Sequence, residues 1–96
     1  MKLLKVLIVD DSSVMRKIVE RSLRQAGLNI AAVLEAGNGA EGLVEVQKGG
    51  GDMILSDINM PVMDGLEFLK NLATLDSAKG IPVVMITTEG SEARVV

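Results

Sequence analysis

The 96-residue sequence contains no cysteine and no histidine. The first absence excludes disulfides and thiolate sites, and the second removes the commonest protein ligand of transition metals and the commonest general base. Any metal bound here must therefore be one that prefers oxygen ligands. Tryptophan and tyrosine are also absent, and Phe68 is the single aromatic residue. Flavin or nucleic-acid sites that stack on aromatic rings are therefore not expected.

Positive charge and long apolar runs are scarce too. The chain has 10 Lys and Arg against 13 Asp and Glu, a net charge of -3, which argues against direct nucleic-acid binding. The longest apolar runs have the length of strands, not of membrane spans, and the apolar start of the chain meets Asp10-Asp11 without a signal-peptide cleavage site. With 48% hydrophobic residues, we expect a single globular domain over residues 1–96, cytoplasmic and without a membrane partner.

Short apolar runs rich in Val, Ile and Leu predict strands that are buried on both faces. These runs cover residues 3–9, 53–56 and 81–87. Residues 30–34 are less apolar and form a weaker candidate, which suits an edge strand. Continuous apolar strands without alternation are typical of a parallel sheet that helices cover on both sides.

Helical patterns lie between these runs. Ser12 or Ser13 can cap a first helix that ends at Gly27, and a poorer second helix covers about residues 40–48. Asp64 can cap a third helix, with Glu67 three residues later in a capping-box arrangement. One face of the first helix is expected to carry Met15, Ile18, Val19, Ser22, Leu23 and Ala26, and one face of the third is expected to carry Leu66, Leu69 and Ala73.

The alternation of strands and helices predicts an α/β fold with a right-handed parallel sheet. A further helix is predicted from about Ser91, and the apolar strand at 81–87 calls for a neighbour on each edge. We therefore expect a doubly wound sheet of order 2-1-3-4 that lacks its fifth strand and last helix, so that the domain is C-terminally incomplete.

Three acids end two neighbouring strands of the expected sheet. Asp10 and Asp11 follow the first strand and Asp57 ends the third, and these two strands flank the switch point of a doubly wound sheet, where ligands bind. Each acid alone is better interpreted as a turn or cap residue. Three together repel one another unless they share a cation, and Mg²⁺ prefers carboxylate oxygens.

A hydroxyl group is expected at the same edge. Thr87 or Thr88 ends the fourth strand and can donate a hydrogen bond to an anion held on the metal. Threonine also suits strands because it is β-branched, which explains a lone threonine equally well.

The segments VLIVDDSSVMRKIVERSL, ILSDINMPVMDGLEFLK and IPVVMITTEG resemble the receiver domain of two-component response regulators. The resemblance covers the whole chain and is closest to the stand-alone chemotaxis type, with its flavodoxin-like, CheY-like sheet order. It implies that Asp57 accepts a phosphoryl group. It also implies that Asp11, Asp57 and the carbonyl of Asn59 coordinate Mg²⁺, with Asp10 acting mainly through a water.

Further roles follow from the same resemblance. Thr87 would bind the phosphoryl group and move when the domain switches, and Asn59 and Glu89 would tune the phosphoryl lifetime. The partners would be a histidine kinase and a downstream effector protein, and the domain would be a phosphoacceptor that assists its own phosphorylation and dephosphorylation, not an enzyme. Receivers carry a lysine on a fifth strand, which this chain lacks; Lys79 precedes the fourth strand and is no substitute.

Two other functions stay open. A receiver-fold interaction module that never takes phosphate is disfavoured by the three acids. A Mg²⁺-dependent phosphatase with an aspartyl intermediate is disfavoured because Asn59 stands where such enzymes carry a general acid two residues after the nucleophile.

The expected free edge of the fourth strand also predicts self-association. Unpaired backbone groups beside an apolar strand favour strand addition, and uncovered apolar surface favours burial against a second copy. We expect the contact through the fourth strand, through residues 91–96, or through an exchanged segment.

Overall fold

The computed structural model describes residues 3–49, 51–86 and 93–95. In chain order the elements are β1 (Leu4–Val9), α1 (Ser13–Gln25), β2 (Ile30–Ala36), α2 (Gly39–Gln47), β3 (Met53–Asp57), α3 (Gly65–Leu72), a 3₁₀ turn η1 (Asp76–Ala78), β4 (Val83–Ile86) and β5 (Ala93–Val95). Among the described residues no helix is both long enough and apolar enough to cross a bilayer.

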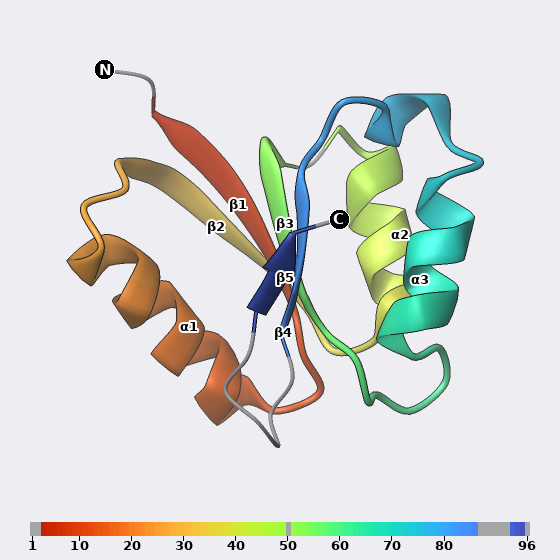
Figure 1. Ribbon diagram of the computed structural model, residues 1–96, viewed down its shortest axis with the longest axis horizontal. Helices are drawn as coiled ribbons and strands as arrows, with labels where there is room; N and C mark the ends of the chain where they lie inside the picture. Colours follow the sequence, from red (N-terminus) through yellow and green to blue (C-terminus); the bar gives the residue numbers. More distant parts are fainter. Residues whose placement is uncertain (1–2, 50, 87–92, 96) are drawn as a thin grey trace.

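The strands form one sheet in the order β2-β1-β3-β4-β5. β1 to β4 are parallel to their neighbours, and α1 covers one face of the sheet while α2 and α3 cover the other (Figure 1). The predicted α/β class and the order 2-1-3-4 are therefore confirmed, with β2 at the edge as expected.

The outer edge of β4 differs from the prediction. β5 pairs with it in the antiparallel sense, with Val84 opposite Val95 and Ile86 opposite Ala93. The helix predicted from about Ser91 is therefore wrong over residues 93–95, and the free edge predicted for β4 is occupied. The backbone groups of an apolar strand need hydrogen-bond partners, and the antiparallel pairing with β5 supplies them.

The helix boundaries follow from their caps. Ser12 Oγ accepts a hydrogen bond from the N–H of Met15 at 3.2 Å, and Asp64 Oδ1 accepts one from that of Glu67 at 2.8 Å. Asn38 caps α2 in the same way. Gly27, with φ of +92°, follows α1 in the left-handed conformation that glycine adopts without strain. The predicted bounds of the first two helices and the predicted start of the third are correct to within one or two residues.

Of the face predicted for α3, only Leu69 packs against the buried cluster. Phe68 and Leu72 are buried, while Leu66 is 56% exposed and Ala73 is exposed. The cause lies at the first residue of the helix: a Cβ on Gly65 would come within 2.1 Å of the Asp57 carbonyl oxygen. This close approach turns the side of α3 that carries Gly65, Phe68 and Leu72 toward β3.

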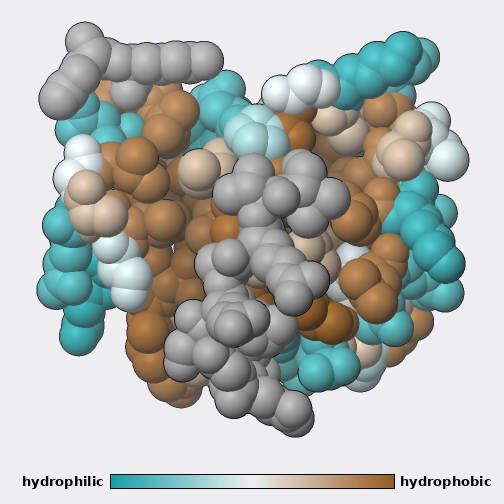
Figure 2. All heavy atoms as spheres, in the orientation of Figure 1, coloured by the Kyte–Doolittle hydropathy of each residue, from teal (hydrophilic) through white to brown (hydrophobic). Residues whose placement is uncertain are grey.

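The sheet separates two apolar clusters. On the side of α2 and α3, here called the α2/α3 face, the buried residues are Leu7, Val9, Ala36, Val46, Ile54, Phe68, Leu72, Val83 and Met85. On the side of α1, here called the α1 face, they are Val6, Ile8 and Leu55. No residue of α1 itself is buried, and Figure 2 shows hydrophobic side chains at the surface beside this helix.

Candidate functional site

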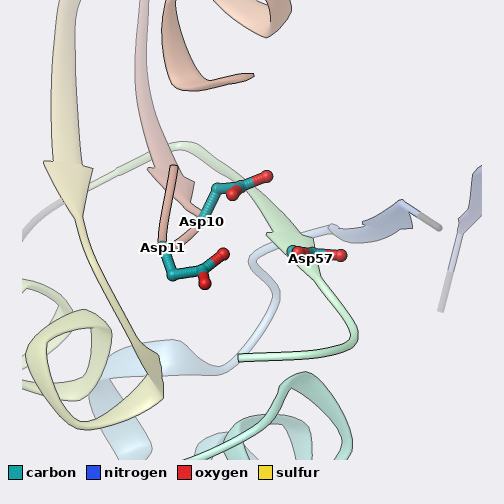
Figure 3. Close-up of side chains that lie close together, drawn as sticks. All are labelled: Asp10, Asp11 and Asp57. Carbon is teal, nitrogen blue, oxygen red and sulfur yellow. The ribbon is translucent and has the colours of Figure 1, made fainter. Parts of the chain in front are cut away.

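The three predicted acids meet at the carboxyl edge of the sheet. Asp10 directly follows β1 and Asp57 is the last residue of β3, and these strands are paired with Val9 opposite Ser56. One carboxylate oxygen from each of Asp10, Asp11 and Asp57 lies within 4.8 Å of the other two (Figure 3). The convergence predicted from the strand order is thus confirmed.

Backbone hydrogen bonds hold Asp10 in place. Its N–H donates to the carbonyl of Ala36 on β2 at 3.0 Å, and its Oδ1 accepts from the N–H of Ser12 at 2.9 Å. Since Ser12 also caps α1, the first turn of the helix and the end of β1 form one unit. Asp10 is 5% exposed, whereas Asp11 is exposed.

Asp57 is held by the loop that follows it. Its Oδ1 accepts from the N–H of Ile58 at 2.8 Å, and the N–H of Asn59 also donates to the carboxylate. The N–H of Gly65 donates to the carbonyl of Ile58 at 2.7 Å, which closes the loop onto the start of α3. The carboxylate is therefore held by backbone N–H groups of this loop, and Asp57 is only 5% exposed.

The electrostatics of the site disfavour three negative charges. Burial raises the pKa of Asp57, and the nearby charge of Asp11 raises it further, while the two backbone N–H groups oppose the shift. Burial likewise raises the pKa of Asp10 against the hydrogen bond from Ser12, with the charges of Asp57 and Asp11 adding to the increase. No ion pair of the described residues reaches these acids.

Such a site suits a hard cation. Its side-chain donors are crowded carboxylate oxygens, which is the ligand type that Mg²⁺ takes, and none of the described lysines or arginines forms an ion pair with them. An ionised carboxylate held at a sheet edge is also an oxygen nucleophile at neutral pH. The arrangement can therefore hold a divalent cation next to a positioned nucleophile.

The other predicted site residues are placed only in part. Asn59 lies beside Asp57, and its backbone N–H donates a hydrogen bond to the Asp57 carboxylate. Thr87 and Glu89, together with Thr88, lie outside the described residues.

One contact of the site was missed. Arg16 on α1 donates from Nη1 to the backbone carbonyl of Asp10 at 2.5 Å and from Nε to Glu35 Oε1 on β2 at 2.9 Å. Glu35 is 19 residues away in the chain, so no local spacing could have indicated the pair.

Comparisons with known proteins agree with this fold and site. The family model of the response regulator receiver domain matches residues 6–96. Chemotaxis protein CheY-3 of Vibrio cholerae serotype O1 is 41% identical over 95 residues, which are 99% of this chain and 72% of that protein. CheY1 of Helicobacter pylori is 40% identical over 94 residues, 97% of this chain and 74% of that protein. The solved structure of the chemotaxis response regulator CheY4 of Vibrio cholerae superposes with a TM-score of 0.78 at 43% identity, over 94% of this chain and 72% of that one.

Proposed function

Because the chain belongs to the response regulator receiver domain family, which its match over residues 6–96 establishes, we propose that it accepts a phosphoryl group from a phosphohistidine of a histidine kinase onto Asp57. The single observation that carries the proposal is the convergence of Asp10, Asp11 and Asp57 within 4.8 Å at the edge of the sheet. The phosphorylated domain then changes conformation and controls a downstream effector protein.

The chemistry requires a positioned oxygen nucleophile and no general base. A carboxylate oxygen of Asp57 attacks the phosphorus; a P–O bond forms, the P–N bond to the kinase imidazole breaks, and its electron pair returns to that nitrogen. The N–H groups of Ile58 and Asn59 orient the carboxylate for attack. Asp57 is only 5% exposed at the end of β3, so a phosphodonor can reach it only from the open edge of the sheet.

Mg²⁺ is the cofactor of this proposal. Asp11, Asp57 and the carbonyl of Asn59 would hold it, with Asp10 acting mainly through a water. When bound, it supplies positive charge that offsets the repulsion between the acids and the incoming phosphoryl oxygens. Burial is the main cause of the raised pKa values of Asp10 and Asp57, and the charges of the neighbouring acids add to it, so a bound cation would stabilise the ionised carboxylates.

The remaining assignments rest on the family and its chemotaxis relatives. Thr87 binds the phosphoryl group and takes part in the switch, and Asn59 and Glu89 tune the phosphoryl lifetime. The output is of the chemotaxis type, as the similarity to the chemotaxis proteins CheY-3 and CheY1 suggests. The domain acts in the cytoplasm as a phosphoacceptor, not as an enzyme with a separate substrate.

Self-association of the 96-residue chain also belongs to this proposal. Pairing between β4 and β5 removes the free edge of β4 as a route. The remaining support is the α1 face, where Val14 is 66% and Ile18 49% exposed next to a lightly covered sheet. Burying such side chains against a second copy contributes about 25 cal/mol per Å² of apolar surface.

Labelling with a small phosphodonor tests the phosphorylation. The protein is incubated with phosphoramidate in the presence of Mg²⁺, and peptide mass spectrometry should find an acid-stable, base-labile adduct on the segment 54–60. Asp57→Asn removes the nucleophile and should abolish the adduct. Asp52→Asn is the matched control, because this exposed acid precedes the same strand at its opposite end.

Two results would count against the assignment: labelling that persists in Asp57→Asn, or a wild-type protein that takes no label while Mg²⁺ is bound. The second would favour an interaction module that takes no phosphate. Continuous release of phosphate from small phosphoesters would instead favour the phosphatase alternative.

A further inference from the structure

Arg16 bridges three elements next to the acid site. Its side chain extends from the first turn of α1, donates to the carbonyl oxygen of Asp10 after β1, and pairs with Glu35 on β2. The side chain is only 18% exposed, and Glu35 Oε2 accepts a second hydrogen bond from Lys17 at 3.4 Å. The Arg16 guanidinium and Lys17 lower the pKa of Glu35, so this partner stays ionised.

The carbonyl that Arg16 contacts is part of the peptide plane that joins Asp10 to Asp11. The N–H of Asp10 is already fixed by Ala36 on β2. With the carbonyl fixed by Arg16, both ends of Asp10 are held, and the direction in which the chain continues into Asp11 is set. Asp11 needs such support because it is the exposed member of the three acids.

The chemistry of arginine explains why this residue type suits the position. A planar guanidinium offers several N–H donors in a fixed fork, so it can serve a carbonyl and a carboxylate at once. Lysine can supply the charge at the same place, but it lacks the rigid fork. Removal of hydrogen-bonded residues behind metal ligands typically weakens metal binding by about 10–100-fold.

We propose that Arg16, braced by Glu35, is a positioning residue for the cation site: it fixes the Asp10–Asp11 peptide and thereby presets the Asp11 carboxylate. This inference rests on the proposed binding of Mg²⁺ at that site. The contacts are to a backbone carbonyl and to Glu35, so the residue acts through its neighbours and not by touching the metal or the phosphoryl group.

The test compares variants of the 96-residue chain at Arg16 with a control variant at another ion pair of the same helix. Arg16→Met keeps the apolar stem and removes the fork, and Arg16→Lys keeps the charge. Arg24→Met is the control, because Arg24 also pairs with a glutamate, Glu20, at 3.3 Å but lies at the other end of α1. Mg²⁺ dissociation constants come from calorimetry, and free energies of unfolding from urea titrations without metal.

A second readout does not depend on the metal. The ¹⁵N order parameter of the Asp11 amide is measured in metal-free wild type and in Arg16→Met. We expect it to fall in the variant while the amides of β3 stay rigid. A purely structural role of Arg16 would lower stability without this local effect.

The expected pattern is an about tenfold or larger rise in the Mg²⁺ dissociation constant for Arg16→Met, incomplete rescue by Arg16→Lys, and no change for Arg24→Met. Unchanged affinity in Arg16→Met, full rescue by lysine, or an equal loss in Arg24→Met would each overturn the proposal. If wild type binds no Mg²⁺, the proposed function fails separately, and an unchanged Asp11 order parameter would then overturn the positioning role as well. Should Arg16→Met not fold, both measurements are made on Arg16→Lys. We then expect weaker Mg²⁺ binding and a lower Asp11 order parameter than in wild type. Wild-type values of both would overturn the positioning role.

Discussion

On the α2/α3 face of the sheet nine of the described residues form a buried cluster, whereas on the α1 face three do. α2 and α3 both bury side chains, while α1 lies over the sheet with partly exposed residues only. Buried apolar area is the dominant favourable contribution to folding. The α2/α3 face therefore contributes most of the stability, and the first turn of α1 contributes chiefly to the acid site.

The largest expected effect is a difference in stability between truncation of a buried residue on the α2/α3 face and of a partly buried residue on the α1 face. Phe68→Ala removes a fully buried ring and should lower the free energy of unfolding by about 3–5 kcal/mol. Leu23→Ala, on α1, should cost only about 1–2 kcal/mol, because part of this side chain is already in water. Urea unfolding followed by far-ultraviolet circular dichroism measures both. Equal losses would mean that the two faces stabilise the fold alike.

Self-association tests whether the lightly covered face is the contact surface. Ile18→Lys should raise the dissociation constant of the dimer about tenfold or more, since burial of such a side chain is worth about 1.5–3 kcal/mol. Leu66→Lys is the control, because Leu66 is 56% exposed, close to the 49% of Ile18, but lies on α3. Sedimentation velocity over a concentration series measures the dimer dissociation constant of each protein. A wild type that stays monomeric throughout, or an equal effect of both variants, would contradict self-association through the α1 face.

The acid site lies where the two faces meet, and its pH dependence can be predicted in sign. The folded-state pKa of Asp10 is raised above its ordinary value of 3.8, so folding favours the protonated acid. The stability linked to this group is complete below that value and is lost as the pH rises through the raised pKa. Asp10→Asn imitates the protonated form and can still accept the hydrogen bond from Ser12.

Asp10→Asn should therefore unfold at higher urea concentration than wild type at pH 7 without metal, and the advantage should vanish below pH 3.8. Adding Mg²⁺ should reduce the stability advantage of Asp10→Asn at pH 7. At ten times its dissociation constant, Mg²⁺ stabilises wild type by about 1.4 kcal/mol. An asparagine variant that is less stable than wild type at pH 7 would show that burial does not penalise the charge.

The smallest expected effect concerns the loop between β3 and α3. Val62 has a φ of 68° and is 82% exposed, and the N–H of Met63 donates across it to the carbonyl of Pro61 at 2.7 Å. A β-branched residue is strained in this conformation, so Val62→Gly should stabilise the fold by about 0.5–1 kcal/mol, even after the entropic cost of glycine. The melting temperature measured by calorimetry should therefore rise in Val62→Gly. A lower melting temperature would show that the backbone at Val62 is not strained.

Features that depend on local sequence were predictable. The caps at Ser12 and Asp64 and the stop at Gly27 follow from interactions within a few residues. The meeting of Asp10, Asp11 and Asp57 needed only the strand order, because parallel strands bring their carboxyl ends to one edge.

Features that depend on distant contacts were not predictable. The buried side of α3 is decided by the fit of Gly65 against the Asp57 carbonyl, which outweighs the apolar spacing of Leu66. The pairing of β5 with β4 depends on a partner strand, not on the helix propensity of the segment. Arg16 reaches Glu35 only after β2 has joined β1.

The single aromatic ring of the chain gives the α2/α3 face its own magnetic reporter. A Cβ on Gly42 would lie 2.9 Å from the ring of Phe68 and 3.2 Å from a methyl group of Val9, so both side chains border this glycine. The ring current of Phe68 shifts the resonances of nearby groups, and no other side chain can do so because the sequence has no other aromatic ring. Methyl chemical shifts therefore report the closure of this face without an introduced label.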